Sequence, residues 1–247
     1  MRKPLTFLIA YLFAFVLVQP PQLAAQYVQF GYNKGGGGGG TPPSVVQTAS
    51  GSSFCQLPST IAAGDSIVIP YAVWAGTDPT TITDGGPGYT YVHSITAQTA
   101  AQTLQQPGLF IASNVAAWGG SPFNITASGG TGTAKLFCYE VHGPVTAPVL
   151  DTGCGSPPCW SSTSNSSSAI TVNCSAACLL LNILSSTTQA SAAQQTGAGW
   201  VCDYGSPCPA AGAPNFYLSA GHLGETSSGA YSLTPAGSVD GFVVPIK

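Results

Sequence analysis

The stretch Gly132–Pro144, GTAKLFCYEVHGP, decides the fold. It is a run of strand-forming residues with glycine near both ends, and successive side chains of a strand point to opposite faces. The alternation gives one face of Leu136, Cys138, Glu140 and His142 and another of Lys135, Phe137, Tyr139 and Val141. Because neither face is purely polar, this stretch is predicted to be a central strand of a two-layer β protein. Glu140 then lies beside a core, where a carboxylate needs a partner.

Short runs of this kind recur from Ser44 onward, each ended by a cluster of Gly, Pro, Asn or Ser. The candidate strands are Val45–Ala49, Ser66–Trp74, Thr80–Thr83, Tyr89–Ala97, Leu109–Val115, Phe123–Ala127, Thr133–His142, Ala169–Cys174, Cys178–Ser185, Gly199–Tyr204, Asn215–His222, Ala230–Leu233 and Val239–Ile246. This spacing predicts an all-β fold, a two-sheet antiparallel β-sandwich that is jelly-roll-like or immunoglobulin-like. Pro70 and Pro245 cannot donate to a ladder, so each is expected at an edge or a bulge.

The ends of the chain predict its organisation. Residues 1–25 combine a basic start, an apolar run from Leu5 to Val18 and small residues before Gln26, which is typical of a cleaved secretory signal peptide. Residues 26–43 contain six consecutive glycines and a Pro pair, which indicates a flexible tether. It either spaces the domain from a surface or is a tail without a function of its own. Residues 44–247 are predicted to form the sandwich domain, with a rim insertion at about residues 151–168.

Charge excludes several classes of partner. After cleavage behind Ala25, three lysines (Lys34, Lys135 and Lys247) stand against eight acidic residues, so the net charge is 3 − 8 = −5. Binding to nucleic acid or anionic lipid requires clusters of Lys and Arg, which this chain lacks. A nearly uncharged polar surface fits an extracellular or cell-surface protein, and no membrane insertion is expected once the signal peptide is removed.

All eight cysteines lie in the exported part, which indicates an oxidising compartment. Short separations favour the pairs Cys154–Cys159, Cys174–Cys178 and Cys202–Cys208. Cys55 and Cys138 are then left to close a long loop. A zinc site is disfavoured because the gaps do not match the spacings of zinc ligands. The sandwich is therefore expected to be disulfide-stapled, without a metal cofactor.

Several motifs resemble a known group of proteins. They are Ala63–Ile69 (AGDSIVI), Ile82–Thr90 (ITDGGPGYT), Phe110–Val115 (FIASNV), Tyr139–Gly143 (YEVHG) and Ser228–Leu233 (SGAYSL). In this order they are similar to secreted bacterial and phage-like β-sandwich surface modules, over about residues 61–246. The resemblance implies an extracellular module, but that group has no common activity and no shared catalytic residues. The chain departs from the pattern in its Gly-Pro-Gly turn and its extra cysteines.

Glu140 and His142 share a strand face, so they are candidates for general acid–base chemistry in a cleft. The alternative is that Glu140 accepts hydrogen bonds from loop amides or a tyrosine hydroxyl and fixes the rim of the sandwich. A glycosidase would need two carboxylates across a cleft. Glu225 is the only other glutamate, Asp203 and Asp240 are the alternatives for the second carboxylate, and nothing in the flanking residues marks a pair. Because no hydrolase or phosphate-binding motif is present, the chain is predicted not to be an enzyme.

Three further residues are candidates for binding. Asp84 precedes Gly-Gly-Pro-Gly, where it either contributes to a calcium or ligand loop or caps its own turn. Calcium is not indicated, since the other aspartates are scattered. Trp118 and Trp160 fall in loops and are the tryptophans expected to be exposed, where they would stack on a sugar. The alternatives are that Trp160 covers a disulfide and that Trp118 has a structural role.

The sequence therefore predicts a non-catalytic binding or adhesion module of the cell surface, which recognises carbohydrate through its rim loops. The alternative is a structural subunit that assembles with copies of itself into a filament, coat or virion decoration. A third possibility is a glycoside hydrolase that uses Glu140.

Overall fold

The computed structural model describes residues 41–74, 76–95, 105–142, 161–186, 199–204, 211–213 and 216–247. These residues form sixteen strands. The strands are β1 (Ser44–Ser52), β2 (Phe54–Leu57), β3 (Ser66–Trp74), β4 (Thr81–Asp84), β5 (Val92–Ile95), β6 (Gln105–Ala112), β7 (Phe123–Ser128), β8 (Thr133–His142), β9 (Ser161–Ser166), β10 (Ile170–Cys174), β11 (Cys178–Ser186), β12 (Val201–Cys202), β13 (Ala211–Ala213), β14 (Phe216–Glu225), β15 (Gly229–Leu233) and β16 (Val239–Ile246). The predicted all-β sandwich is confirmed, and all the strand pairs are antiparallel.

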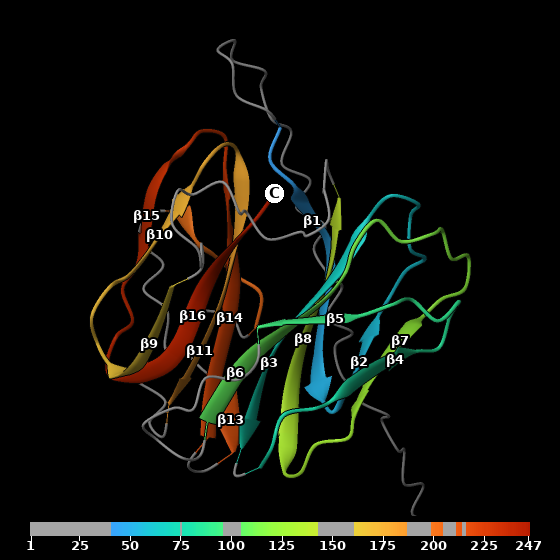
Figure 1. The fold of residues 1–247 in the computed structure, drawn as a ribbon, viewed down its shortest axis with the longest axis horizontal. Helices are drawn as coiled ribbons and strands as arrows, with labels where there is room; N and C mark the ends of the chain where they lie inside the picture. The colour runs from blue at the N-terminus through green and yellow to red at the C-terminus, as the bar shows by residue number, and fades with distance from the viewer. Residues whose placement is uncertain are drawn as a thin grey trace, which may run out of the picture. The chain divides into compact units, whose positions relative to one another are not determined.

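The strands form four sheets, where two were predicted. Sheet I has the order β1-β8-β3-β6-β5, and sheet II has the order β2-β7-β4. Sheet III has the order β12-β14-β11-β16-β9, with β13 also paired to β14, and sheet IV consists of β10 and β15. Figure 1 shows sheets I and II, built from the first eight strands, beside sheets III and IV, built from the last eight.

The two halves repeat one topology. If the strands of each half are numbered from one to eight, the larger sheet contains the order 1-8-3-6 in both halves, and the smaller sheet contains the pair 2-7. This is the strand order of a jelly roll, in which eight strands are divided between two sheets. We therefore describe the two halves as two jelly-roll modules, the first made of β1–β8 and the second of β9–β16.

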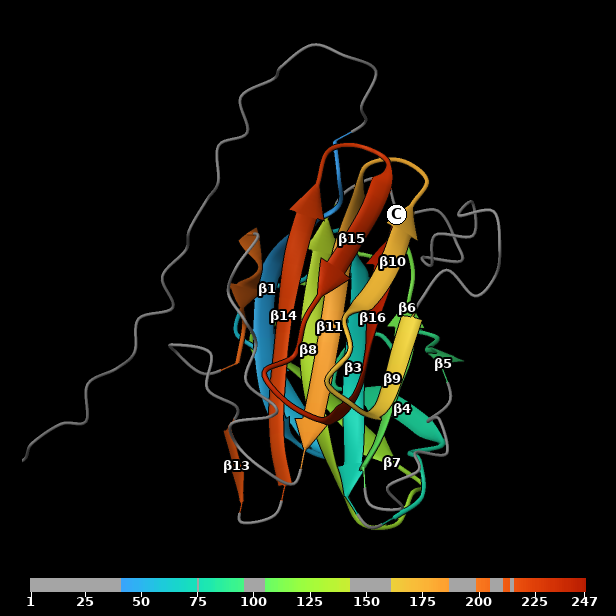
Figure 2. The same ribbon diagram turned by 90° about the vertical axis from the view of Figure 1, so that its left-hand side faces the viewer.

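Three hydrophobic clusters hold the sheets in the layer order II–I–III–IV. The first cluster joins sheets I and II through side chains such as Ile69 and Ile125. The second joins sheets I and III through side chains such as Val68 and Phe242. The third joins sheets III and IV, and Figure 2 shows β10 and β15 in front of sheet III. Sheets I and III are therefore buried on both faces, and their strands carry near-continuous apolar runs.

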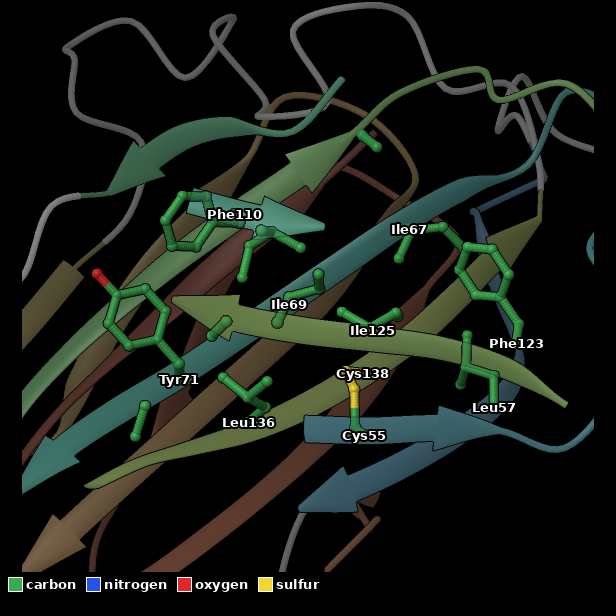
Figure 3. Close-up of a cluster of buried hydrophobic side chains, with 14 of the residues drawn as sticks. Cys55, Leu57, Ile67, Ile69, Tyr71, Phe110, Phe123, Ile125, Leu136 and Cys138 are labelled. Carbon is green, nitrogen blue, oxygen red and sulfur yellow. A yellow bond between two sulfur atoms is a disulfide. The ribbon is translucent and has the colours of Figure 1, made fainter. Parts of the chain in front are cut away.

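Strand β8 lies inside sheet I, between β1 and β3, as predicted. Its two faces are also confirmed, since Leu136 and Cys138 lie in the cluster shared with sheet II, whereas Phe137 and Tyr139 lie in the cluster shared with sheet III. A disulfide joins Cys138 to Cys55 of β2 and so connects the two sheets of the first module (Figure 3).

The predicted pairs Cys55–Cys138 and Cys174–Cys178 are both confirmed. Cys202 is also in a disulfide. Its predicted partner Cys208, together with Cys154 and Cys159, lies outside the described residues. Disulfide bonds are compatible with an extracellular location.

Three strands were not expected from the sequence. Neither β2 nor β13 lies within a predicted strand. Residues 161–166, part of the predicted rim insertion at 151–168, form β9 at the edge of sheet III. Their sequence, SSTSNS, has no apolar alternation, so pairing with β16 is what makes them a strand.

Pro70 was expected at an edge or a bulge, but it lies in β3 between β8 and β6, where the β3–β8 register does not shift. The β3–β8 pairing has a gap at Ile69 and Pro70, which is consistent with the missing donor of proline. Pro245 of β16 pairs with β11 on one side. On its other side β9 pairs only with residues 239–243 of β16, so Pro245 has no partner strand there among the described residues and lies at an edge, as expected.

Candidate functional site

Glu140 of β8 is held in a buried polar network at one end of the first module. Only 1 % of the residue is exposed. Its Oε1 accepts a hydrogen bond from the backbone N–H of Ala62 at 2.9 Å, and its Oε2 accepts one from Nε2 of Gln47. Both oxygens therefore have donors, which is the condition for tolerating a carboxyl group inside a core.

Gln47, on the neighbouring strand β1, connects Glu140 to the loop before β3. Its Oε1 accepts a hydrogen bond from the backbone N–H of Ser59 at 2.9 Å, and its Nε2 also donates to the backbone oxygen of Thr60 at 3.3 Å. Together with the bond from Ala62, these contacts fasten the loop between β2 and β3 to two strands of sheet I. The network thus fixes the position of a rim loop.

Asp65 ends this loop and contacts both Glu140 and His142. One carboxylate oxygen of Asp65 is hydrogen-bonded to Nδ1 of His142, whose side chain is 65 % exposed. The other oxygen of Asp65 is buried and has no donor among the described residues. The carboxyl group of Asp65 lies close enough to that of Glu140 to disfavour its charged form.

The electrostatics of Glu140 follow from this arrangement. Burial raises the pKa of Glu140, and the carboxyl group of Asp65 raises it further, while the hydrogen bonds from Ala62 and Gln47 lower it. A carboxyl group with a raised pKa next to an oriented imidazole has the elements of acid–base chemistry. In this structure, however, Glu140 is shielded from solvent, and only His142 reaches the surface.

Asp84 caps its own turn. Its Oδ1 accepts hydrogen bonds from the backbone N–H groups of Gly86 and Gly88, both at 3.0 Å, and its Oδ2 accepts one from Tyr89 at 2.8 Å. These are the bonds expected of an aspartate that precedes glycines in a tight turn. The carboxylate is therefore used within the β4–β5 loop, as the turn-cap alternative predicts.

Trp118 packs on the rim of the first core and is half-buried. Its backbone pairs with Ile61 in both directions, with N–O distances of 3.0 and 2.9 Å. Its ring meets Phe123 edge-on, with centroids 5.1 Å apart, and a Cβ at Gly86 would lie 3.1 Å from it. Trp118 therefore braces two loops against the core, which leaves less of its ring free to stack on a ligand.

The predicted site residues are brought together only in part. The charges of Asp84 and Glu140 both act on Tyr89, whose pKa is raised by partial burial and then by these two carboxyl groups. These residues therefore lie at the same end of the first module. Glu225 lies in β14 of the second module. Partial burial raises the pKa of Glu225, and an interaction with Tyr231 lowers it by a smaller amount. Trp160 lies outside the described residues.

Each of the three histidines lies beside an aspartate that sequence reasoning did not connect with it. The pairs are His93–Asp78, with an N–O distance of 3.9 Å, His142–Asp65, and His222–Asp203, with a distance of 2.8 Å. His93 is also 2.6 Å from the hydroxyl of Tyr71. Within the described residues, no three His, Cys, Asp or Glu side chains gather so that they could hold a metal ion.

The chain matches no protein-family model, and no curated protein or solved structure matches it. The described residues also contain no helix with the length and apolar character needed to cross a membrane. Function is therefore inferred from the geometry of the molecule itself.

Proposed function

We propose that this chain is a non-catalytic binding or adhesion module that acts outside the cell. The observation that carries the proposal is that Glu140, the strongest acid–base candidate of the sequence, is buried and hydrogen-bonded to a loop. Both of its oxygens accept hydrogen bonds, and it is 1 % exposed, so it serves to fix the rim loop rather than to meet a substrate. The disulfides support an extracellular location.

The test measures binding and turnover with the same protein. The secreted full chain is incubated with intact cells of the producing organism and with a panel of polysaccharides, and both retention and release of sugar are followed. Saturable retention without release of sugar is expected. Turnover that is lost in a folded Glu140→Gln variant would establish a hydrolase and refute the proposal.

A second candidate function, assembly with copies of the same chain, is favoured by the sheet edges. The strands at the outer edges of the four sheets are β1, β5, β2, β4, β12, β13, β9, β10 and β15. Among these described edges Asp84 is the only Asp, Glu, Lys or Arg, and it is engaged in its own turn. Charged residues and proline are what usually protect an edge from pairing with another chain.

Light scattering across a concentration series separates the two functions. A binding module is expected to stay monomeric, whereas an assembling subunit grows in mass with concentration. The edge position Val46, which is 40 % exposed in β1, offers the matched variant. Val46→Lys would dissolve an assembly built on that edge and would leave a monomer unchanged.

A further inference from the structure

The outer face of sheet II is an uncharged polar surface. Alternate residues of β2, β7 and β4 enter the first core, and the residues between them point outward. The outward residues, which we call the sheet II face, are Phe54, Gln56, Thr81, Thr83, Asn124, Thr126 and Ser128. They comprise hydroxyl groups, amide groups and one phenyl ring, without any ionisable side chain. In Figure 1 the three strands lie on the outer side of sheet I, away from sheet III.

The polar groups of this face are held in order by the sheet. Gln56 and Asn124 are paired across the strands, with Nε2 donating to Oδ1 at 2.8 Å, and the hydroxyls of Thr81 and Ser128 are also 2.8 Å apart. Neighbouring strands are about 5 Å apart, and outward residues repeat about every 7 Å along a strand. The face is thus a regular lattice of donors and acceptors on a disulfide-linked sheet, which limits the entropy lost on binding.

Phe54 supplies the apolar part of this surface. It is 42 % exposed, and its cross-strand neighbour is Thr126, which in turn pairs with Thr83. This row places an aromatic ring beside two threonine methyl and hydroxyl groups. An exposed aromatic ring flanked by hydrogen-bonding groups is suited to a ligand that has both an apolar face and hydroxyl groups.

The chemistry of the face selects one class of ligand. A nucleic acid or an acidic glycan would require cations, and the face contains none. A neutral sugar chain presents hydroxyl groups and apolar ring faces, which are the complements of what the face offers. We propose that the sheet II face binds a neutral polysaccharide. This assignment rests on the proposed binding function. It places the contact with the sugar on a strand face, where the sequence predicted the rim loops.

The second module provides a matched control. The outer face of sheet IV also carries paired hydroxyls, since Thr171 and Ser232 are 2.7 Å apart, and the exposed Asn173 is opposite Ala230. This face has only two strands and no outward aromatic side chain equivalent to Phe54, because the only aromatic residue of its strands, Tyr231, packs against the third core. A lysine at Thr171 therefore tests the effect of a surface charge without touching the proposed site.

The experiment measures retention of the labelled full chain on cellulose, chitin, starch and an insoluble β-1,3-glucan, with a polygalacturonate gel as the acidic comparison. We expect saturable binding to at least one neutral polymer. Phe54→Ala and Thr126→Lys should each weaken it at least tenfold, whereas Thr171→Lys should not change it. Thermal unfolding verifies that each variant is folded, and Thr83→Lys replaces any variant that is not.

Each other outcome has a distinct meaning. If the wild type binds a neutral polymer and the sheet II variants bind equally well, the assignment of the face is overturned while the proposed function stands. If the wild type is retained by cells but by none of the neutral polymers, the ligand class is overturned. If Phe54→Ala changes the oligomeric state instead, the face is a contact between copies and the assignment is also overturned. Failure to bind cells or any polymer refutes the proposed function itself.

Discussion

Removal of the Cys55–Cys138 disulfide is expected to destabilise the chain much more than removal of the Cys174–Cys178 disulfide. The first bond closes a loop with a sequence separation of 83, and the second closes one of 4. In the chain-entropy description these loops correspond to about 4.5 and about 2 kcal/mol of stabilisation. The expected difference in the free energy of unfolding is therefore about 2.5 kcal/mol.

The two bonds form a matched pair because all four cysteines are buried. Replacing each pair with two alanines leaves similar voids, so the packing losses largely cancel in the comparison. The assay is urea unfolding followed by tyrosine and tryptophan fluorescence. With a slope of about 2.5 kcal/mol per M, the difference amounts to about 1 M in the urea midpoint.

Equal destabilisation of the two double variants, or a larger effect of the short loop, would refute this reasoning. Such a result would mean that the Cys55–Cys138 disulfide does not restrict the unfolded chain more than the Cys174–Cys178 disulfide, although its loop is longer. The comparison also bears on function, because the same bond connects β2, which carries Phe54, to β8 inside sheet I.

Three further predictions follow from buried groups. Because the pKa of Glu140 is raised in the folded state, its contribution to stability should decline as pH rises from about 4.5. In urea titrations the wild type should therefore lose stability relative to Glu140→Gln between pH 4 and pH 8, and a constant difference would contradict this. Burial also raises the pKa of Tyr71 and Tyr139 above 10. The free energy of unfolding should therefore fall above pH 10, by about 3 kcal/mol per pH unit for the two groups together. An unchanged free energy of unfolding at pH 11 would be inconsistent with their burial. Trp118→Ala should lower stability by about 2 kcal/mol through lost packing on Phe123, as seen in thermal unfolding, and no loss would show that the ring does not brace the rim.

The parts of the fold that depend on local pattern were predictable. The alternation in β8 gave its two faces correctly because side chains of a strand alternate whatever their surroundings. The short disulfide Cys174–Cys178 was predictable for a similar reason, since its partners are close in sequence. Strand β9 was not predictable, because its six residues are all Ser, Thr or Asn and become a strand only by pairing with β16.

The repetition of the jelly roll could not be seen in the sequence. Strands β3 and β11 hold equivalent places in the two modules, yet their sequences, SIVIPYAVW and CLLLNILSS, share only an apolar character. Both strands are buried on two faces, and burial of that kind demands apolar side chains without fixing their identity. The number of sheets was therefore underestimated.

The residues at the centre of the site were predictable from the sequence, but the residues that contact them were not. Glu140 and His142 share a strand, so their common face could be derived from local alternation. Asp65 and Gln47 come from other segments, and their contact with Glu140 depends on the register of β3 and β1 against β8. The Gly-Asp step before β3 was the only signal for Asp65. The sheet II face was missed because β2, which contributes Phe54, was not recognised as a strand.

Hydroxyl-radical footprinting tests most directly whether the sheet II face is the binding surface. Phe54 is the exposed aromatic side chain of this face, and its oxidation can be followed by mass spectrometry with and without a bound neutral polysaccharide. We predict that the polymer protects Phe54 and leaves the exposed side chains of Val92 and Val201 as reactive as before. Unchanged oxidation of Phe54 in the bound chain, with protection of Val92 or Val201 instead, would contradict the assignment.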